Sequence, residues 1–79
     1  MKCRGIIQAV TGKKINVQMQ KMGIRRVKET YVVNLDGNTQ FINCNINDLC
    51  SNATVQVTFN GIVALSMPPQ IYAEKIRLI

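Results

Sequence analysis

The chain contains no histidine and no tryptophan, and it has only four acidic residues. Histidine is the side chain that most often serves as a general base near neutral pH, and a cysteine nucleophile usually needs it as a partner. The acidic residues are scattered, and their spacing suggests no catalytic pair. The sequence also lacks a glycine-rich phosphate loop and a nucleophile-elbow motif. It therefore predicts a protein that is not an enzyme and needs no cofactor.

Cysteine is scarce as well, with Cys3, Cys44 and Cys50 as the three examples. An odd number argues against a complete disulfide framework, while a bond between Cys44 and Cys50 would close a short loop in an oxidising compartment. A zinc site needs four ligands at closer spacings, so we expect no metal site. We expect Cys3 and one of the other two to be small core residues.

Long hydrophobic runs are missing too. No apolar stretch approaches the ~18 residues that a membrane helix needs, so we expect no transmembrane segment. The N-terminal sequence MKCRGIIQAV does not have the layout of a signal peptide, because its apolar stretch is short and is interrupted by Gln8. As written, the chain is expected to be cytoplasmic. If the N-terminus has been trimmed, export or association with the cell envelope is the expectation instead.

What the sequence does contain is alternation of apolar and polar residues, which is typical of half-buried strands. The alternating runs are residues 2–10, 14–22, 26–35 and 53–59. A chain of 79 residues suits one domain, and with 47% apolar residues it can form a modest core. The side chains expected to point inward are Cys3, Gly5, Ile7 and Ala9, then Ile15, Val17 and Met19, then Val27, Tyr31, Val33 and Leu35, and finally Ala53, Val55, Val57 and Phe59.

Between the third and fourth runs, the segment FINCNINDLCSN predicts a short helical element. Asn45 is placed to cap one helical turn over residues 46–50, with Ile46 and Leu49 entering the core.

The C-terminal part predicts a turn at Asn60-Gly61, with residues 62–65 pairing back briefly, and a sheet edge or barrel rim at Pro68-Pro69. In IYAEKIRLI the apolar phase slips by one residue between Ala73 and Ile76, which predicts a β-bulge.

Three strands, a short helical turn and two further strands are the elements of a five-stranded, all-β OB-like barrel. We predict this fold for residues 1–79 as a single domain. Another small β-barrel or a sheet with one helix is the alternative.

The stretch ATVQVTFNGIVALSMPPQIYAEKI, residues 53–76, also carries a family resemblance. Its pattern of a strand with alternating valines ending in Phe-Asn-Gly, then Ser-x-Pro-Pro-Gln, then Ala-x-x-Ile, resembles the YobA-like family of small bacterial domains. The resemblance implies an OB-like barrel and brings no function, and members of that family are commonly exported or lipid-anchored. The matching residues are Val55, Val57, Phe59, Asn60, Gly61, Ser66, Pro68, Pro69, Gln70, Ala73 and Ile76.

Positive charge is concentrated near the N-terminus. Residues 1–28 carry eight of the ten Lys and Arg residues and no acid, and the chain has a net charge of +6. In OB-type barrels the face of strands two and three is the usual nucleic-acid site. We therefore predict that nucleic acid or another polyanion binds at Lys13, Lys14, Gln18, Lys21, Arg25, Arg26 and Lys28.

One observation limits this prediction, and one alternative interpretation competes with it. No aromatic side chain falls on the outward face of these strands, so bases would not stack there and binding would be weak, salt-sensitive and nonspecific. A basic surface that only keeps a small protein in solution is the alternative interpretation.

A second hypothesis is of a different class. Apolar loop tips at residues 22–24 (with Met22 and Ile24) and residues 62–69 (from Ile62 to Pro69) would contact a protein partner or form a homo-oligomer. The chain would then be an interaction or cell-envelope accessory domain, and its charge would be incidental.

Overall fold

The computed structural model describes residues 1–20 and 26–79. The residues predicted at positions 21–25, among them Lys21, Met22, Ile24 and Arg25, lie outside the described part. The strands are β1 (Lys2–Thr11), β2 (Lys14–Gln20), β3 (Lys28–Asn34), β4 (Gln40–Ile42), β5 (Thr54–Phe59) and β6 (Gln70–Leu78), and a 3₁₀ turn, η1, covers Ile46–Asp48. Among the described residues, no helix has the length and apolar character that crossing a bilayer requires.

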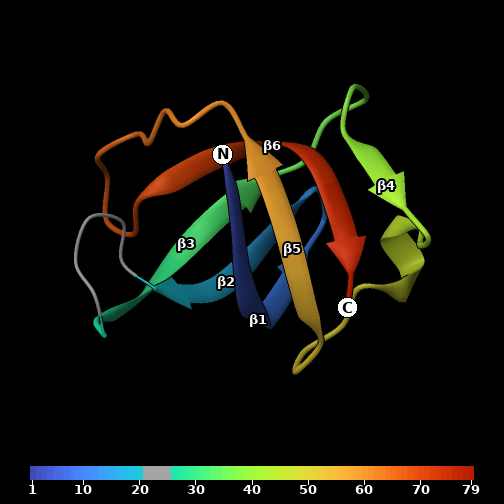
Figure 1. Ribbon diagram of the computed structural model, residues 1–79, viewed down its shortest axis with the longest axis horizontal. Coiled ribbons are helices and arrows are strands. Elements are labelled where there is room, and N and C mark those ends of the chain that lie inside the picture. Colours follow the sequence, from blue (N-terminus) through green and yellow to red (C-terminus); the bar gives the residue numbers. More distant parts are fainter. Residues whose placement is uncertain (21–25) are drawn as a thin grey trace.

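Five of these strands close into a barrel (Figure 1). β1 pairs antiparallel with both β2 and β5, β2 pairs with β3, and β5 pairs with β6. The parallel pairing of β3 with β6 closes the ring. The predicted OB-like barrel is therefore confirmed, with its short helical turn between the third and fourth barrel strands. β4 was not predicted. It adds to β6 in parallel outside the ring.

The alternation in the sequence places the core correctly. Along β1, β2, β3 and β5 the predicted inward side chains are buried or half-buried, and Ile7, Val17, Val33 and Phe59 have no exposed surface. A fully buried side chain of this size contributes about 1.5–3 kcal/mol relative to an exposed one. These residues, with Ile71 and Ile76 of β6, form one continuous core.

Two inward predictions are wrong. Val27 precedes β3 and is exposed, because the strand begins only at Lys28. Ile46 is also exposed, because a helical element of three residues directs few side chains toward the barrel, and Leu49 enters the core instead.

The predicted cap of η1 is confirmed. The side-chain oxygen of Asn45 accepts a hydrogen bond from the backbone N–H of Asn47 at 2.9 Å. A carboxylate oxygen of Asp48 accepts one from the backbone N–H of Asn45 at 2.9 Å. Each side chain thus satisfies a backbone donor at the start of the turn, as in a capping box.

The predicted bulge in the last strand is also confirmed. Thr58 of β5 pairs with Lys75, but the next residue, Phe59, pairs with Ala73, so Glu74 is the extra residue of β6. A second bulge, not predicted, places Gln8 as the extra residue of β1 opposite β2. The predicted pairing of residues 62–65 reduces to a single bridge, in which Ala64 pairs with Gln70 at the start of β6.

Candidate anion-binding surface

Of the predicted basic residues of the β2–β3 face, the structure describes Lys13, Lys14, Arg26 and Lys28, and these four do not form one cluster. Lys14 lies opposite Asn34 at one end of the β2–β3 ladder, and Lys28 lies opposite Gln20 at the other end. Seven paired residues separate these ends by ~20 Å. Lys13 lies in the turn beside Lys14, and Arg26 lies just before Lys28 with a positive φ of 65°. The four described cations of this face therefore lie as two separate pairs.

Between these two pairs the surface is polar and uncharged. Gln18 lies half-buried on the outer face of β2, where it pairs with Thr30 of β3. The hydroxyl of Thr30 donates a 2.8 Å hydrogen bond to the side-chain oxygen of Gln8, the bulge residue of β1. This part of the face can make polar contacts with a ligand, but it concentrates no charge.

Among the described residues, a denser group of cations lies on the outer face of β1, β5 and β6. Across these strands Arg4 pairs with Gln56, and Gln56 pairs with Arg77. In the neighbouring row Lys2 pairs with Thr58, and Thr58 pairs with Lys75. We call Lys2, Arg4, Lys75 and Arg77 the cationic quartet.

The strand geometry fixes the dimensions of the quartet. Two residues on the same face of a strand are ~7 Å apart, and two strands separated by a third are ~10 Å apart. The four cations therefore mark the corners of a small rectangle, with Gln56 and Thr58 between them. The bulge of β6 helps to form the quartet. After it, Lys75 and Arg77 are both exposed, and buried Ile76 lies between them.

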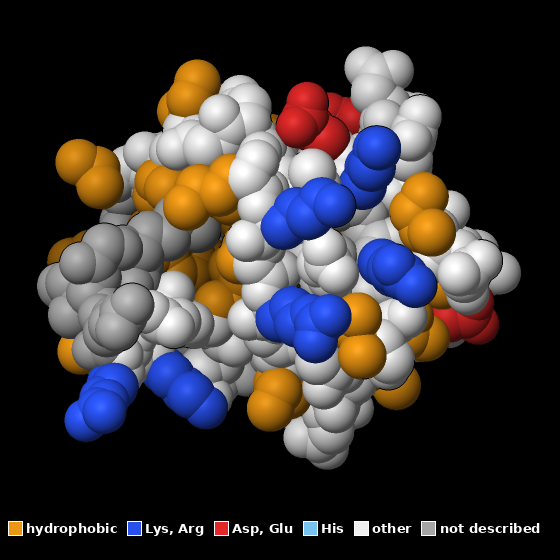
Figure 2. Space-filling view, viewed as in Figure 1, with side chains coloured by type: hydrophobic (Ala, Val, Ile, Leu, Met, Phe, Trp, Pro, Cys, Tyr) orange, Lys and Arg blue, Asp and Glu red, His pale blue; other side chains and the backbone are white. Residues whose placement is uncertain are grey.

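The side chains of the quartet are exposed, and none of the four forms an ion pair or a side-chain hydrogen bond within residues 1–20 and 26–79. Figure 2 shows Lys and Arg side chains gathered in the middle of this face, over β1, β5 and β6. A depression of about 190 Å³ lies among them, lined by Lys2, Ile42, Gln56, Thr58, Lys75 and Arg77. Exposed cations without a carboxylate partner around amide and hydroxyl groups are suited to holding an anion.

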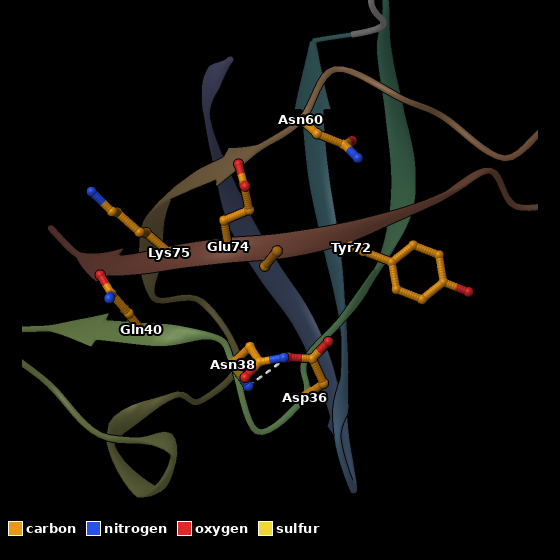
Figure 3. A pocket seen from close by; sticks show the side chains of 8 residues that line it. Asp36, Asn38, Gln40, Asn60, Tyr72, Glu74 and Lys75 are labelled. Carbon is orange, nitrogen blue, oxygen red and sulfur yellow. Dashed lines mark hydrogen bonds between the residues drawn. The ribbon is translucent and has the colours of Figure 1, made fainter.

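A second depression, of about 370 Å³, lies between the turn after β3 and strand β6 (Figure 3). Asp36 and Glu74 both line it, but Figure 3 shows Glu74 pointing away from Asp36. An oxygen of Asp36 accepts a 2.8 Å hydrogen bond from the backbone N–H of Asn38, so this carboxylate stabilises the turn after β3. The two carboxylates do not converge on one point, as an acid–base pair would need to do.

Tyr72 lines the same depression and is 59% exposed on the outer face of β6. Its outward direction follows from the phase of β6, in which Ile71 and Ala73 are buried on either side of it. Lys75 and Arg77 follow Tyr72 on the same strand, and Tyr72 and Lys75 both line this depression, although Figure 3 shows their side chains pointing in opposite directions along β6.

The three cysteines are free thiols. Cys3 lies on the inner side of β1, and its Sγ is 3.7 Å from the carbonyl oxygen of Val57. Burial raises the pKa of the Cys3 thiol, and the positively charged N-terminus opposes this shift to a smaller extent. Cys44 is half-buried and Cys50 is exposed. In the described part of the chain, no three His, Cys, Asp or Glu side chains are grouped as metal ligands.

The quartet was missed because its two halves lie at opposite ends of the chain. A signal was present: Lys2-x-Arg4 and Lys75-x-Arg77 share the spacing of two that places side chains on one face of a strand. Which strands are neighbours could not be read from that spacing. It depends on β5 pairing with both β1 and β6.

No protein-family model matches the chain, and no curated protein matches it. The fold does match solved structures. A crystal structure of CusF with Ag(I) has a TM-score of 0.71 at 11% sequence identity and covers all of this chain and 96% of that one. A structure of a tryptophan-to-alanine variant of CusF from Escherichia coli with Cu(II) has a TM-score of 0.68 at 11% identity, covering all of this chain and 90% of that one. At this identity the likeness shows the shared fold, a small closed OB-like barrel.

Proposed function

We propose that this protein is a non-catalytic binding module that holds an anionic polymer, a single-stranded nucleic acid, on the cationic quartet. The proposal is supported above all by one observation. Four cations from the two ends of the chain occupy neighbouring outward positions, and none is paired with a carboxylate in the described part. Unpaired, closely spaced like charges are unfavourable for the folded protein alone, and a bound polyanion relieves them.

The neighbouring side chains fit this ligand class. Lys and Arg neutralise phosphates, while Gln56 and Thr58 offer hydrogen bonds to phosphate or sugar oxygens between them. Tyr72 adds a face on which a base can stack, a contact worth about 1–3 kcal/mol per base. A strand of nucleic acid lying along β6 would meet Tyr72 first and then Lys75 and Arg77.

The cations of the β2–β3 face have a secondary role in this proposal. Their two pairs lie too far apart to contact one short segment together, but they add to the field that attracts a polyanion. They raise the association rate more than they determine where the ligand rests.

Fluorescence anisotropy with labelled single-stranded DNA and RNA, across a series of salt concentrations, tests the proposal. Four phosphate contacts predict a slope of about −3 in a plot of log K against log salt concentration. Changing all four quartet residues to Gln is expected to remove most of this slope and to lower the affinity at least about tenfold. Tyr72→Leu should weaken binding with little effect on the slope, because stacking involves no counterion release.

The chain offers a control of equal charge. A second variant removes an equal number of positive charges, four, from described positions of the β2–β3 face. It changes Lys13, Lys14, Arg26 and Lys28 to Gln. This variant should keep most of the affinity. If it loses as much affinity as the quartet variant, the proposed site is wrong. If heparin binds as tightly as nucleic acid and Tyr72→Leu changes nothing, the ligand class is wrong.

A further inference from the structure

The loop between β5 and β6, residues 60–69, presents large apolar side chains to solvent. Leu65 is 96% exposed, Met67 is 99% exposed and Ile62 is 69% exposed. Figure 2 shows hydrophobic side chains projecting at the end of the molecule where Figure 1 places this loop. Leucine and methionine at such exposures are unfavourable in water unless another phase or surface covers them.

The loop is held in this arrangement by its own contacts. Ala64 and Gln70 exchange two backbone hydrogen bonds, of 2.8 and 3.1 Å, and Val63 packs against the core. The hydroxyl of Ser66 donates a 2.6 Å hydrogen bond to the carbonyl oxygen of Pro68. These contacts anchor the loop at Val63 and Ala64, whereas Ile62, Leu65 and Met67 remain exposed.

The loop carries no charge, and cations lie near it on two sides, with one acid, Glu29, beside Met67. No Asp, Glu, Lys or Arg occurs from residue 59 to residue 73. At the base of the loop, the N-terminal ammonium donates a 2.8 Å hydrogen bond to the carbonyl oxygen of Phe59, and Lys2 follows it. On the other side, Met67, Pro68 and Pro69 share a depression of about 410 Å³ with Glu29 and Thr30, next to Lys28 at the start of β3.

We propose that this loop inserts its apolar tip into the surface of an anionic lipid membrane. An uncharged tip enters the boundary of the acyl chains without desolvating a charge, while flanking cations meet acidic headgroups. A second copy of this chain is a poorer partner, because each copy brings a net charge of +6. A folded protein is also a poorer partner, since tight protein contacts rely on Trp, Tyr and Arg anchors, whereas lipid accepts separate aliphatic side chains without shape complementarity.

Vesicle co-sedimentation tests the proposal with phosphatidylcholine vesicles and with vesicles that also contain phosphatidylglycerol. The protein is expected to sediment with the anionic vesicles at physiological salt. The double variant Leu65→Ser, Met67→Ser should lower this binding by more than about tenfold, because its two changes remove the largest exposed apolar groups. The double variant Val10→Ser, Ile46→Ser is the control, since it removes exposed apolar residues outside the loop and should bind like the wild type.

A fluorescence measurement reports insertion directly, because the natural chain has no tryptophan. In Leu65→Trp the emission should shift to shorter wavelength with anionic vesicles, whereas in Val10→Trp it should not. Binding that survives Leu65→Ser, Met67→Ser, or equal shifts at both tryptophan positions, would overturn the proposal. So would a dimer in sedimentation equilibrium that this double variant dissociates, because the loop would then be a self-association surface.

Discussion

At the scale of single residues, Gly5 is the position where the packing leaves no room. It is buried in β1 opposite β2, and an added Cβ would lie 2.5 Å from the backbone oxygen of Gln18 and in equally close contact with Val17 and Met19. The backbone of β2 cannot move away without disturbing the β1–β2 ladder. Gly5→Ala is therefore expected to lower the free energy of unfolding by about 3 kcal/mol, the upper part of the range for overpacking.

Urea denaturation followed by circular dichroism measures this loss. Gly37→Ala is the control, because an added Cβ at Gly37 meets no atom within 4 Å and should change the stability by less than about 0.5 kcal/mol. Equal midpoints for Gly5→Ala and the wild type would show that the contact between β1 and β2 is looser than described.

At the scale of elements, the bulge of β6 is the device that both bends the strand and presents part of the quartet. Deleting Glu74 removes the extra residue and forces β6 into a regular register with β5. Without the bulge, β6 is too straight to keep all its pairings in the closed barrel. We expect it to lose about two ladder hydrogen bonds, which corresponds to a destabilisation of about 2 kcal/mol. Thermal unfolding measures it. Glu74→Ala keeps the chain length and should unfold near the wild-type temperature; if both variants unfold together, the bulge is not required for closure.

Elements with strong local signals could be predicted from the sequence, and elements that depend on a distant partner could not. The phase slip between Ala73 and Ile76 predicted the bulge, because alternation records which face is buried. β4 is only three residues long and exists through its parallel pairing with β6, so its own sequence carries little signal. Val27 fits the phase of β3 but lies before the strand begins, and phase alone does not mark that boundary.

At the scale of the whole molecule, closure of the barrel redistributes the charge. The sequence places eight of the ten basic residues in the first 28 positions, which directed the prediction to the β2–β3 face. The fold separates the described cations of that face into two pairs. It brings the two basic residues of the acidic C-terminal part, Lys75 and Arg77, beside Lys2 and Arg4. A surface assembled in this way requires the strand order, so a run of charges in the sequence was a poor guide to it.

The same assembly predicts opposite effects of one variant on stability and on binding. Two like charges ~10 Å apart in water repel by about 0.4 kcal/mol, so the six pairs within the quartet amount to about 2 kcal/mol at low salt. Changing the four residues to Gln should therefore raise the melting temperature by about 5 °C or more at ~0.01 M salt, where screening is weak. The gain should shrink at physiological salt, where the Debye length falls to about 8 Å. Single-stranded DNA should raise the melting temperature of the wild type more than that of the variant, because the variant binds more weakly. A variant that is less stable than the wild type at low salt would show that these side chains stabilise the barrel, and the quartet would then be part of the fold rather than a binding surface.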